Sequence, residues 1–191
     1  KVNGNVDVDD DLQLFIDGGS DGDTFLPIRY AGGFICIFKN CSFAFNHVAM
    51  AGTPSMPSGS SGGIKNSGKL KLTNSTVDDG VIVNSGGLYV DGNVSIGSMH
   101  HKLGGRIYVT GTLTNDINIS IVDASDVELY TPIVLGGNGY MLSSADADRI
   151  HFSLPEGFER KYDSKSGSVM VIISSGISQI ANEQPTVVGT Y

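Results

Sequence analysis

Three aspartates in a glycine-rich stretch have the residue type and the spacing that suit a calcium ion. Asp17, Asp21 and Asp23 lie in the run Asp-Gly-Gly-Ser-Asp-Gly-Asp-Thr-Phe. Calcium takes several carboxylate and carbonyl oxygens from a short, flexible loop. Gly18 and Gly19 extend the match toward the Gly-Gly-x-Gly-x-Asp-x repeat of calcium-binding β-rolls, although Asp21 replaces a glycine and the motif occurs once. We therefore expect either a calcium site at Asp17, Asp21 and Asp23 or a solvated acidic turn.

Two further acidic groups raise the question of a polysaccharide-processing enzyme. They are Asp7, Asp9, Asp10 and Asp11 near the start of the chain, and Asp78 and Asp79 in its middle. A lyase also needs a basic group that removes a proton, and a hydrolase needs two carboxyl groups at a set separation. No lysine or arginine falls in register with these positions, and no Gly-x-Ser-x-Gly elbow, phosphate loop or dinucleotide motif occurs. We predict no catalytic residues and no cofactor other than calcium.

The histidines and cysteines are poorly spaced for a shared site. His100 and His101 are adjacent, so on a strand their side chains would point to opposite faces and could not readily share a metal ion. We expect an exposed loop there. Cys36 and Cys41 are the two cysteines of the chain. They are predicted to be buried thiols, and the alternative is a disulfide closed across a turn between them.

The charge balance excludes one class of partner. The chain of 191 residues has a formal net charge of −8 and a pI of about 4.7, and its 12 basic residues are scattered. Phosphate binding needs clustered lysine and arginine, so we exclude nucleic acid. No apolar run approaches the roughly 20 residues that cross a bilayer, so we expect no transmembrane segment. The start at Lys1 lacks the features of a signal peptide, so a secreted origin implies a leader outside this chain.

Repeated glycine motifs predict the elements that must position any site. Gly-Gly pairs open apolar stretches at residues 32, 62, 86 and 104, and a turn glycine precedes an alternating strand at residues 4, 68, 92 and 111. A single rung of this kind cannot bury its inner face alone. We therefore predict stacked rungs of about 20 residues. The predicted fold class is all-β: a right-handed, single-stranded parallel β-helix, or solenoid, with a C-terminal antiparallel capping segment.

The alternation within these strands predicts which side chains form the core. The residues expected to face inward and to stack rung on rung are Leu70, Leu72, Val94, Ile96 and Leu113. Their neighbours Lys69 and Lys71 are expected to face solvent. Asparagines at turns and strands can stack as ladders along such a coil, and the candidates are Asn40, Asn74, Asn93 and Asn118.

The pattern divides the chain into three parts. They are a parallel β-helix over residues 1–125 with a long loop at 51–63, a C-terminal β cap over 126–174, and a polar tail or linker over 175–191. The loop is rich in glycine, serine and proline. The cap is predicted from short strands that include Tyr140–Ser144 and Arg149–Pro155, joined by turns into antiparallel pairs. No segment has a convincing helical period.

The first Gly-Gly motif has a partner further along the chain. Gly32-Gly-Phe-Ile35 is followed by Phe43-Ala-Phe-Asn46. This pairing resembles the Gly-Gly-x-Ile and Phe-x-x-Asn motifs of polymorphic outer-membrane protein repeats, which occur in bacterial β-helical adhesins and autotransporter passengers. The resemblance covers roughly residues 30–120, although one clear Phe-x-x-Asn is present and the period drifts. The region from Tyr130 to Ile173 is similar to the tails of surface proteins from gut Bacteroidetes.

The resemblance implies an extracellular or cell-surface protein associated with the bacterial outer membrane. We expect a non-catalytic, adhesin-like module that presents a rigid β-helical surface to a protein or glycan partner, as part of a larger surface protein. Two alternatives remain. One is a polysaccharide lyase or hydrolase that uses the acidic groups at residues 7–11 or 78–79. The other is a pure structural spacer that binds no ligand.

Overall fold

Within the part of the chain that the structure describes, the regular secondary structure is almost entirely β-strand. The computed structural model describes residues 6–9, 11–19, 25–30, 33–51, 63–78, 81–121 and 130–174. The strands form two largely parallel sheets, accompanied by one short helix, so the predicted all-β class is confirmed. The predicted loop at 51–63, apart from its end residues Ala51 and Gly63, lies outside the described residues. So does the predicted tail at 175–191.

The first sheet has eight strands. In spatial order they are β17 (Phe158–Asp163), β18 (Ser168–Ile173), β15 (Tyr130–Gly136), β13 (Arg106–Val109), β11 (Gly87–Asp91), β8 (Lys69–Thr73), β5 (Ser42–Asn46) and β2 (Gln13–Asp17). Neighbours from β2 to β15 pair in parallel. Strand β18 pairs antiparallel with both β15 and β17. The antiparallel pairs therefore lie at the C-terminal end of this sheet.

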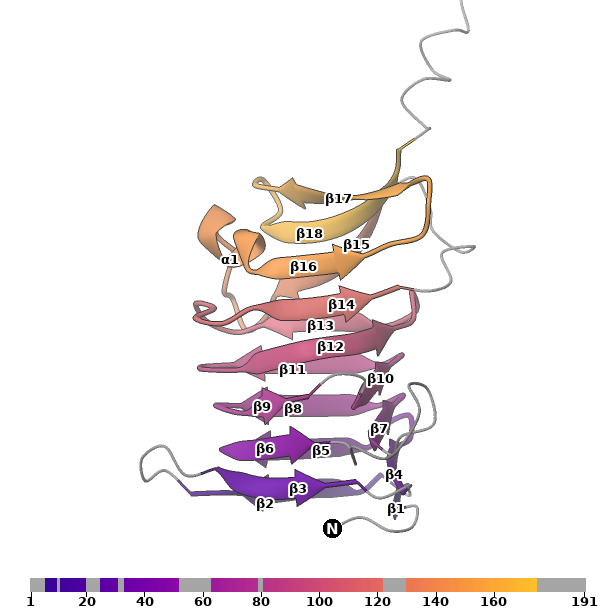
Figure 1. Cartoon of the computed structure of the whole chain (residues 1–191), viewed down its shortest axis with the longest axis vertical. Coiled ribbons are helices and arrows are strands. Elements are labelled where there is room, and N and C mark those ends of the chain that lie inside the picture. Colours follow the sequence, from indigo (N-terminus) through magenta and orange to yellow (C-terminus); the bar gives the residue numbers. More distant parts are fainter. Residues whose placement is uncertain are drawn as a thin grey trace, which may run out of the picture.

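The second sheet has ten strands, and its longest strand, β12 (Ser95–His101), pairs with strands from two separate columns. Its strands are β1 (Val6–Val8), β4 (Phe34–Ile37), β7 (Gly63–Asn66), β10 (Ile82–Asn84), β12 (Ser95–His101), β9 (Thr76–Val77), β6 (Val48–Ala51), β3 (Leu26–Arg29), β14 (Ile117–Ser120) and β16 (Ile150–Ser153). The C-terminal half of β12 pairs with β10 and its N-terminal half with β9. Strand β12 therefore belongs to two columns of strands. Figure 1 shows the strands stacked along the long axis, from β1, β2 and β3 at one end to β17 at the other.

Inward side chains form a continuous core along the stack. In the eight-stranded sheet Phe43, Leu70, Leu88 and Ile107 occupy matching register positions on consecutive strands, and all are buried. Leu72, two residues after Leu70, is buried as well. Alternation on a strand sends every second residue to the same face. The predicted inward positions of Leu70 and Leu72 are therefore confirmed.

The predicted stacking of Val94, Ile96 and Leu113 on these leucines is wrong in register. All three residues are buried, as predicted. Ile96, however, pairs with Val77 and Ile117 in the ten-stranded sheet, and Leu113 belongs to no strand. The turn-glycine motif occurs at different corners of the stack. Motifs that look equivalent in the sequence therefore lead into different columns.

The C-terminal region departs from the predicted antiparallel cap in two places. Strand β16, within Arg149–Pro155, pairs in parallel with β14, so the antiparallel prediction there is wrong. The predicted strand at Tyr140–Ser144 is also wrong, because this segment is a loop that leads into helix α1 (Ser144–Asp148). Ser143 caps the helix by accepting a hydrogen bond from the amide of Asp146. A helix this short has no sequence period to detect.

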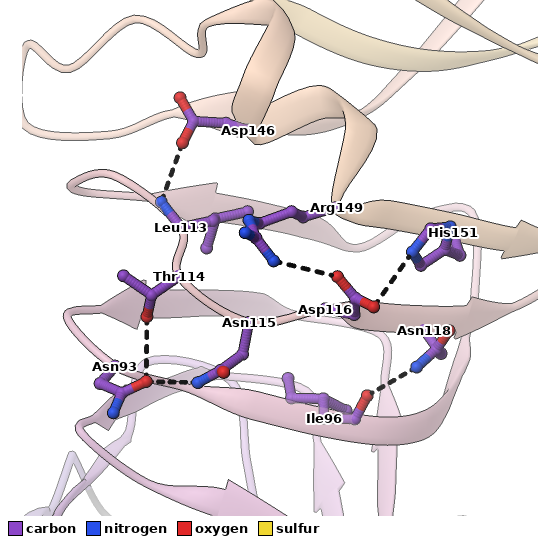
Figure 2. Close-up of polar contacts among 10 residues, drawn as sticks. All are labelled: Asn93, Ile96, Leu113, Thr114, Asn115, Asp116, Asn118, Asp146, Arg149 and His151. Carbon is purple, nitrogen blue, oxygen red and sulfur yellow. Dashed lines mark hydrogen bonds and ion pairs between the residues drawn. The ribbon is translucent and has the colours of Figure 1, made fainter.

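A buried carboxylate fastens α1 to the preceding part of the stack. Asp146 accepts hydrogen bonds from the Leu113 amide at 2.8 Å (Figure 2), from the Tyr140 hydroxyl at 2.6 Å, and from the amide and hydroxyl of Ser143. Burial alone would raise the pKa of Asp146, but these hydrogen bonds outweigh it and hold the pKa below its ordinary value. The carboxylate is therefore occupied in positioning the helix.

Candidate functional site

Three glycines form a close-packed corner between the two sheets. Gly68 follows β7, Gly86 follows β10 and Gly105 follows β12, each just before a strand of the eight-stranded sheet. A Cβ atom on Gly86 would overlap the carbonyl oxygen of Gly68, and one on Gly105 would lie 2.9 Å from the carbonyl oxygen of Gly86. Only glycine fits such a close approach of two backbones. Because no side chain projects there, a recess runs along this corner.

The recess belongs to a groove of about 500 Å³, which we call the corner groove. It is lined by Gln13, Lys39, Asn40, Cys41, Ser42, Ser67, Gly68, Lys69, Gly86, Gly87, Gly104, Arg106 and Tyr108. Three of these residues are cationic, and no carboxylate belongs to the lining. The other polar groups are mainly amides and hydroxyls, which both donate and accept hydrogen bonds. The groove therefore offers positive charge together with neutral hydrogen-bonding groups.

Two stacked tyrosines stand on the outer face of the eight-stranded sheet at the groove. Tyr89 and Tyr108 occupy matching register positions on β11 and β13, and their ring centroids are 4.8 Å apart. The Nζ atom of Lys69 lies 4.5 Å from the ring centroid of Tyr89, a cation–π contact. Burial raises the pKa of Tyr89, and Tyr108 raises it further. The phenol of Tyr89 therefore keeps its proton at neutral pH.

The cations of the groove are not paired with any carboxylate that the structure describes. Among the described residues, no salt bridge involves Lys39, Lys69 or Arg106. Lys71, on the same strand as Lys69, pairs instead with Asp91 at 3.4 Å. The positive charge that faces the groove is therefore available to a ligand.

A buried polar ladder lies under the glycine corner. Asn66, Asn84 and His101 occupy matching register positions on β7, β10 and β12, and none is more than 3% exposed. Asn66 Nδ2 donates to Asn84 Oδ1 at 2.7 Å, and Asn84 Nδ2 lies 3.2 Å from His101 Nδ1. Asn66 also donates to the carbonyl of Gly87, and Asn84 to that of Gly86. The ladder thus fixes the backbone that forms the floor of the groove.

The asparagines predicted to form ladders behave differently. Asn74 Oδ1 accepts a hydrogen bond from the backbone amide of Asn93 at 2.9 Å. This contact joins a side chain to a backbone and is not a rung of a side-chain ladder. Asn40 is at a turn beside the groove and has a positive φ of 71°. Asn118 Nδ2 donates to the carbonyl of Ile96 (Figure 2). The buried ladder of side chains runs through other residues.

The prediction of an exposed loop at His100 and His101 is wrong. Both residues belong to β12, with His100 exposed and His101 buried at the end of the polar ladder. Adjacent residues on a strand point in opposite directions, which explains the contrast. Burial, and to a smaller extent the nearby Arg106, lowers the pKa of His101 to about 4. The imidazole is therefore neutral at pH 7.

The candidate calcium residues are only partly described. Asp17 is exposed at the end of β2, where its Oδ1 accepts hydrogen bonds from the Gly19 amide and from Asn46 Nδ2, both at 2.9 Å. These hydrogen bonds hold the pKa of Asp17 below its ordinary value. Asp21 and Asp23 lie outside the described residues. Within the described ranges no three His, Cys, Asp or Glu side chains gather where a metal ion could sit, so the calcium site stays a prediction.

The described acidic residues considered for polysaccharide chemistry are not among those that line the corner groove. Four of them are exposed, namely Asp7, Asp9, Asp11 and Asp78. Asp10 and Asp79 lie outside the described residues. The described residues that line the groove include no carboxylate. Acid–base chemistry by a carboxylate pair therefore has no support at this groove.

Both cysteines are free thiols, as predicted. Cys41 is buried and lines the groove, whereas Cys36 is half-buried. Burial raises the pKa of Cys36, and the neighbouring carboxylate of Asp7 raises it further. The Cys36 thiol therefore stays protonated at neutral pH and is not an activated nucleophile.

A second polar cluster lies on the ten-stranded sheet. Figure 2 shows Asp116 between Arg149 and His151. Its carboxylate oxygens lie 3.5 Å from Arg149 Nη1 and 3.6 Å from His151 Nε2. All three side chains are about half exposed. Nearby, Asn93 accepts hydrogen bonds from Thr114 and Asn115. Because one carboxylate contacts both Arg149 and His151, this cluster is best explained as a contact between neighbouring rungs.

Comparison of the chain with known proteins found no match. No family model matches it, and no similar curated protein or solved structure is found. The described part of the chain has no helix with the length and apolar character needed to span a membrane.

The corner groove was not predicted from the sequence. Its cations are residues 39, 69 and 106, which are far apart along the chain and form no cluster in the sequence. The Gly-Gly motif held a usable signal. Pairing Gly87 with Arg106 brings Tyr89 next to Tyr108, as the register shows. Aligning the later motifs on their strands rather than on their glycines would have found the tyrosine pair.

Proposed function

We propose that this chain is a right-handed parallel β-helix that serves as a non-catalytic, adhesin-like binding module of a larger bacterial surface protein. The corner groove is its binding site, and a glycan is its ligand. The observation that carries this proposal is the pairing of the stacked tyrosines Tyr89 and Tyr108 with a groove lined by amides, hydroxyls and cations.

The pairing of the strands supports the β-helix. Parallel neighbours such as β5, β8, β11 and β13 require crossover connections, and the chain makes each crossover through the other sheet. Crossovers between parallel strands are right-handed in nearly all proteins. Stacked strands with a buried core form a rigid surface, which suits a module that presents a binding face.

The chemistry of the groove favours a glycan over a protein partner. Sugar hydroxyls both donate and accept hydrogen bonds, as do the side chains of Gln13, Asn40 and Ser42 in the lining. Tyrosine gives rigid, amphipathic contact area at a low cost in conformational entropy. Protein interfaces are centred on well-packed apolar anchors, and no aliphatic side chain is among the described residues that line this groove.

The test is binding of the intact chain to a glycan array, followed by calorimetry on the best ligand. Replacing Tyr108→Ala together with Tyr89→Ala should weaken binding at least about tenfold, because the rigid contact surface is lost. Met141→Ala, at an exposed site away from the groove, should leave affinity unchanged. Thermal unfolding of each variant separates loss of contact from loss of fold.

Three outcomes would overturn the proposal. The first is no glycan bound by the wild-type chain. The second is equal binding by a folded double variant. The third is release of shortened sugar products, which would establish the lyase or hydrolase alternative in place of a binding module.

A further inference from the structure

The cations of the corner groove are arranged along one line of the sheet. Lys69 on β8 and Arg106 on β13 both pair in register with Gly87 on β11, the strand between them. Neighbouring strands are about 4.8 Å apart, so the two backbone positions are separated by about 10 Å. Gly87 puts no side chain between them. The ring of Tyr89 lies over this position, with its Cε2 atom 3.2 Å from where a Cβ atom on Gly87 would be, so the two cations flank an aromatic ring.

Arg106 is held in place by the chain itself. Its Nη1 donates to the carbonyl oxygens of Leu103 at 2.9 Å and Gly105 at 2.7 Å. The guanidinium has three further N–H groups, on Nε and Nη2. A planar guanidinium with a fixed position is well suited to bind a carboxylate or a sulfate through two hydrogen bonds.

The charge of the groove opposes the charge of the whole chain. The formal net charge is −8, yet the lining has Lys39, Lys69 and Arg106 and no carboxylate. Charges further away than about 10 Å are largely screened at 0.1 M salt. Asp9 and Asp11 lie in the turn between β1 and β2, one rung from the turn that holds Lys39. The positive charge is therefore least opposed at Lys69 and Arg106, further along the groove.

We infer that the corner groove binds an anionic saccharide, one that carries carboxylate or sulfate groups at intervals along its chain. This inference rests on the proposed function and adds the chemical class of the ligand. Lys69 and Arg106 each contact one anionic group, and the sugar ring between those groups packs against the tyrosine pair beside Gly87. Lys39, at the turn between β4 and β5, lines the end of the groove nearest to Asp9 and Asp11.

The experiment compares matched sugars that differ in charge alone. Calorimetry is run with polygalacturonate and its fully methyl-esterified form, and with dextran sulfate and dextran. The charged member of at least one pair should bind at least about tenfold more tightly, and its affinity should fall as salt is raised. The pair that shows the preference identifies carboxylate or sulfate as the anionic group.

Substitutions locate the charge effect. Lys69→Gln with Arg106→Gln should remove most of the preference for the charged sugar. Lys65→Gln removes a positive charge on β7, where Lys65 lies over the ring of Phe34, outside the groove lining, and should retain the preference. Because Arg106 also supports the backbone, Lys69→Gln alone is the second variant, and it should lose part of the preference with an unchanged melting temperature.

The outcomes separate this inference from the proposed function. Equal affinity for charged and neutral members of both pairs would overturn the anionic ligand and leave glycan binding intact. Binding to none of these sugars, nor to any other on the array, would overturn both. An equal loss of preference in Lys65→Gln would assign the effect to overall charge and overturn the role of the groove.

Discussion

Leucines at equivalent inward positions are buried in the middle of the stack and partly exposed at its N-terminal end. Leu14 on β2 and Leu88 on β11 belong to one column of register partners, through Phe43 and Leu70. Leu88 is fully buried between Leu70 and Ile107, whereas Leu14 is 36% exposed, with Phe43 on one side. Inward direction on a strand is therefore not enough to bury a residue. A layer on each side along the axis is also required.

The largest effect is expected in the middle of the column. Leu88→Ala should lower the free energy of unfolding by about 2–5 kcal/mol, because neighbouring layers cannot collapse into the cavity. Urea denaturation measures the change. A loss of less than about 1 kcal/mol would show that the middle layers are less tightly packed than the structure indicates.

The second prediction concerns the polar ladder, where the buried middle layers hold a histidine. The pKa of His101 falls from 6.5 to about 4 on folding, so the unfolded chain takes up the proton first as pH falls. The contribution of neutral His101 to stability is complete above about pH 6.5 and is lost between there and about pH 4, by about 3 kcal/mol in all.

Urea denaturation between pH 7 and pH 4 measures this loss. His101→Asn should flatten the profile in this window, because an asparagine continues the Asn66–Asn84 ladder without a titrating group. The exposed His100 on the same strand, changed to asparagine, is the control that should keep the slope. Asp146 and Asp17 have lowered pKa values, so their contributions are lost only at still lower pH. An unchanged slope in His101→Asn would contradict the assignment.

The smallest effect is expected at the N-terminal end. Leu14→Ala should cost less than about 1 kcal/mol, because the side chain is already partly in water and leaves no closed cavity. The same denaturation experiment compares it directly with Leu88→Ala. A cost similar to that of Leu88→Ala would mean that Leu14 is covered in solution.

The local alternation of the strands was readable from the sequence, and the column to which each strand belongs was not. Leu70 and Leu72 face the core as the pattern predicts. Ile96 and Leu113 are buried too, but in different columns, because a glycine marks any corner and does not say which one. Register depends on pairing between strands that are distant in the chain, which a local motif does not contain.

The candidate site depends on the same long-range pairing. Arg106 and Lys69 line one groove because β13 and β8 both pair with β11, the strand between them. His101 was predicted in a loop because the run from Gly97 to Gly104 lies between two glycine-led rungs. Helix α1 was missed because its five residues are too few to show a helical period. Its capping box, Ser143 with Asp146, was the sequence signal that could have indicated it.

The two outer strands of the eight-stranded sheet differ in what they offer to another chain. Strand β17 has the sequence Phe-Glu-Arg-Lys-Tyr-Asp, and charged side chains on an edge strand oppose the addition of a further strand. Strand β2 has the sequence Gln-Leu-Phe-Ile-Asp, and its Phe15 is 63% exposed. Self-association through strand addition is therefore favoured at β2 over β17, and two molecules joined through their β2 strands would form a closed pair.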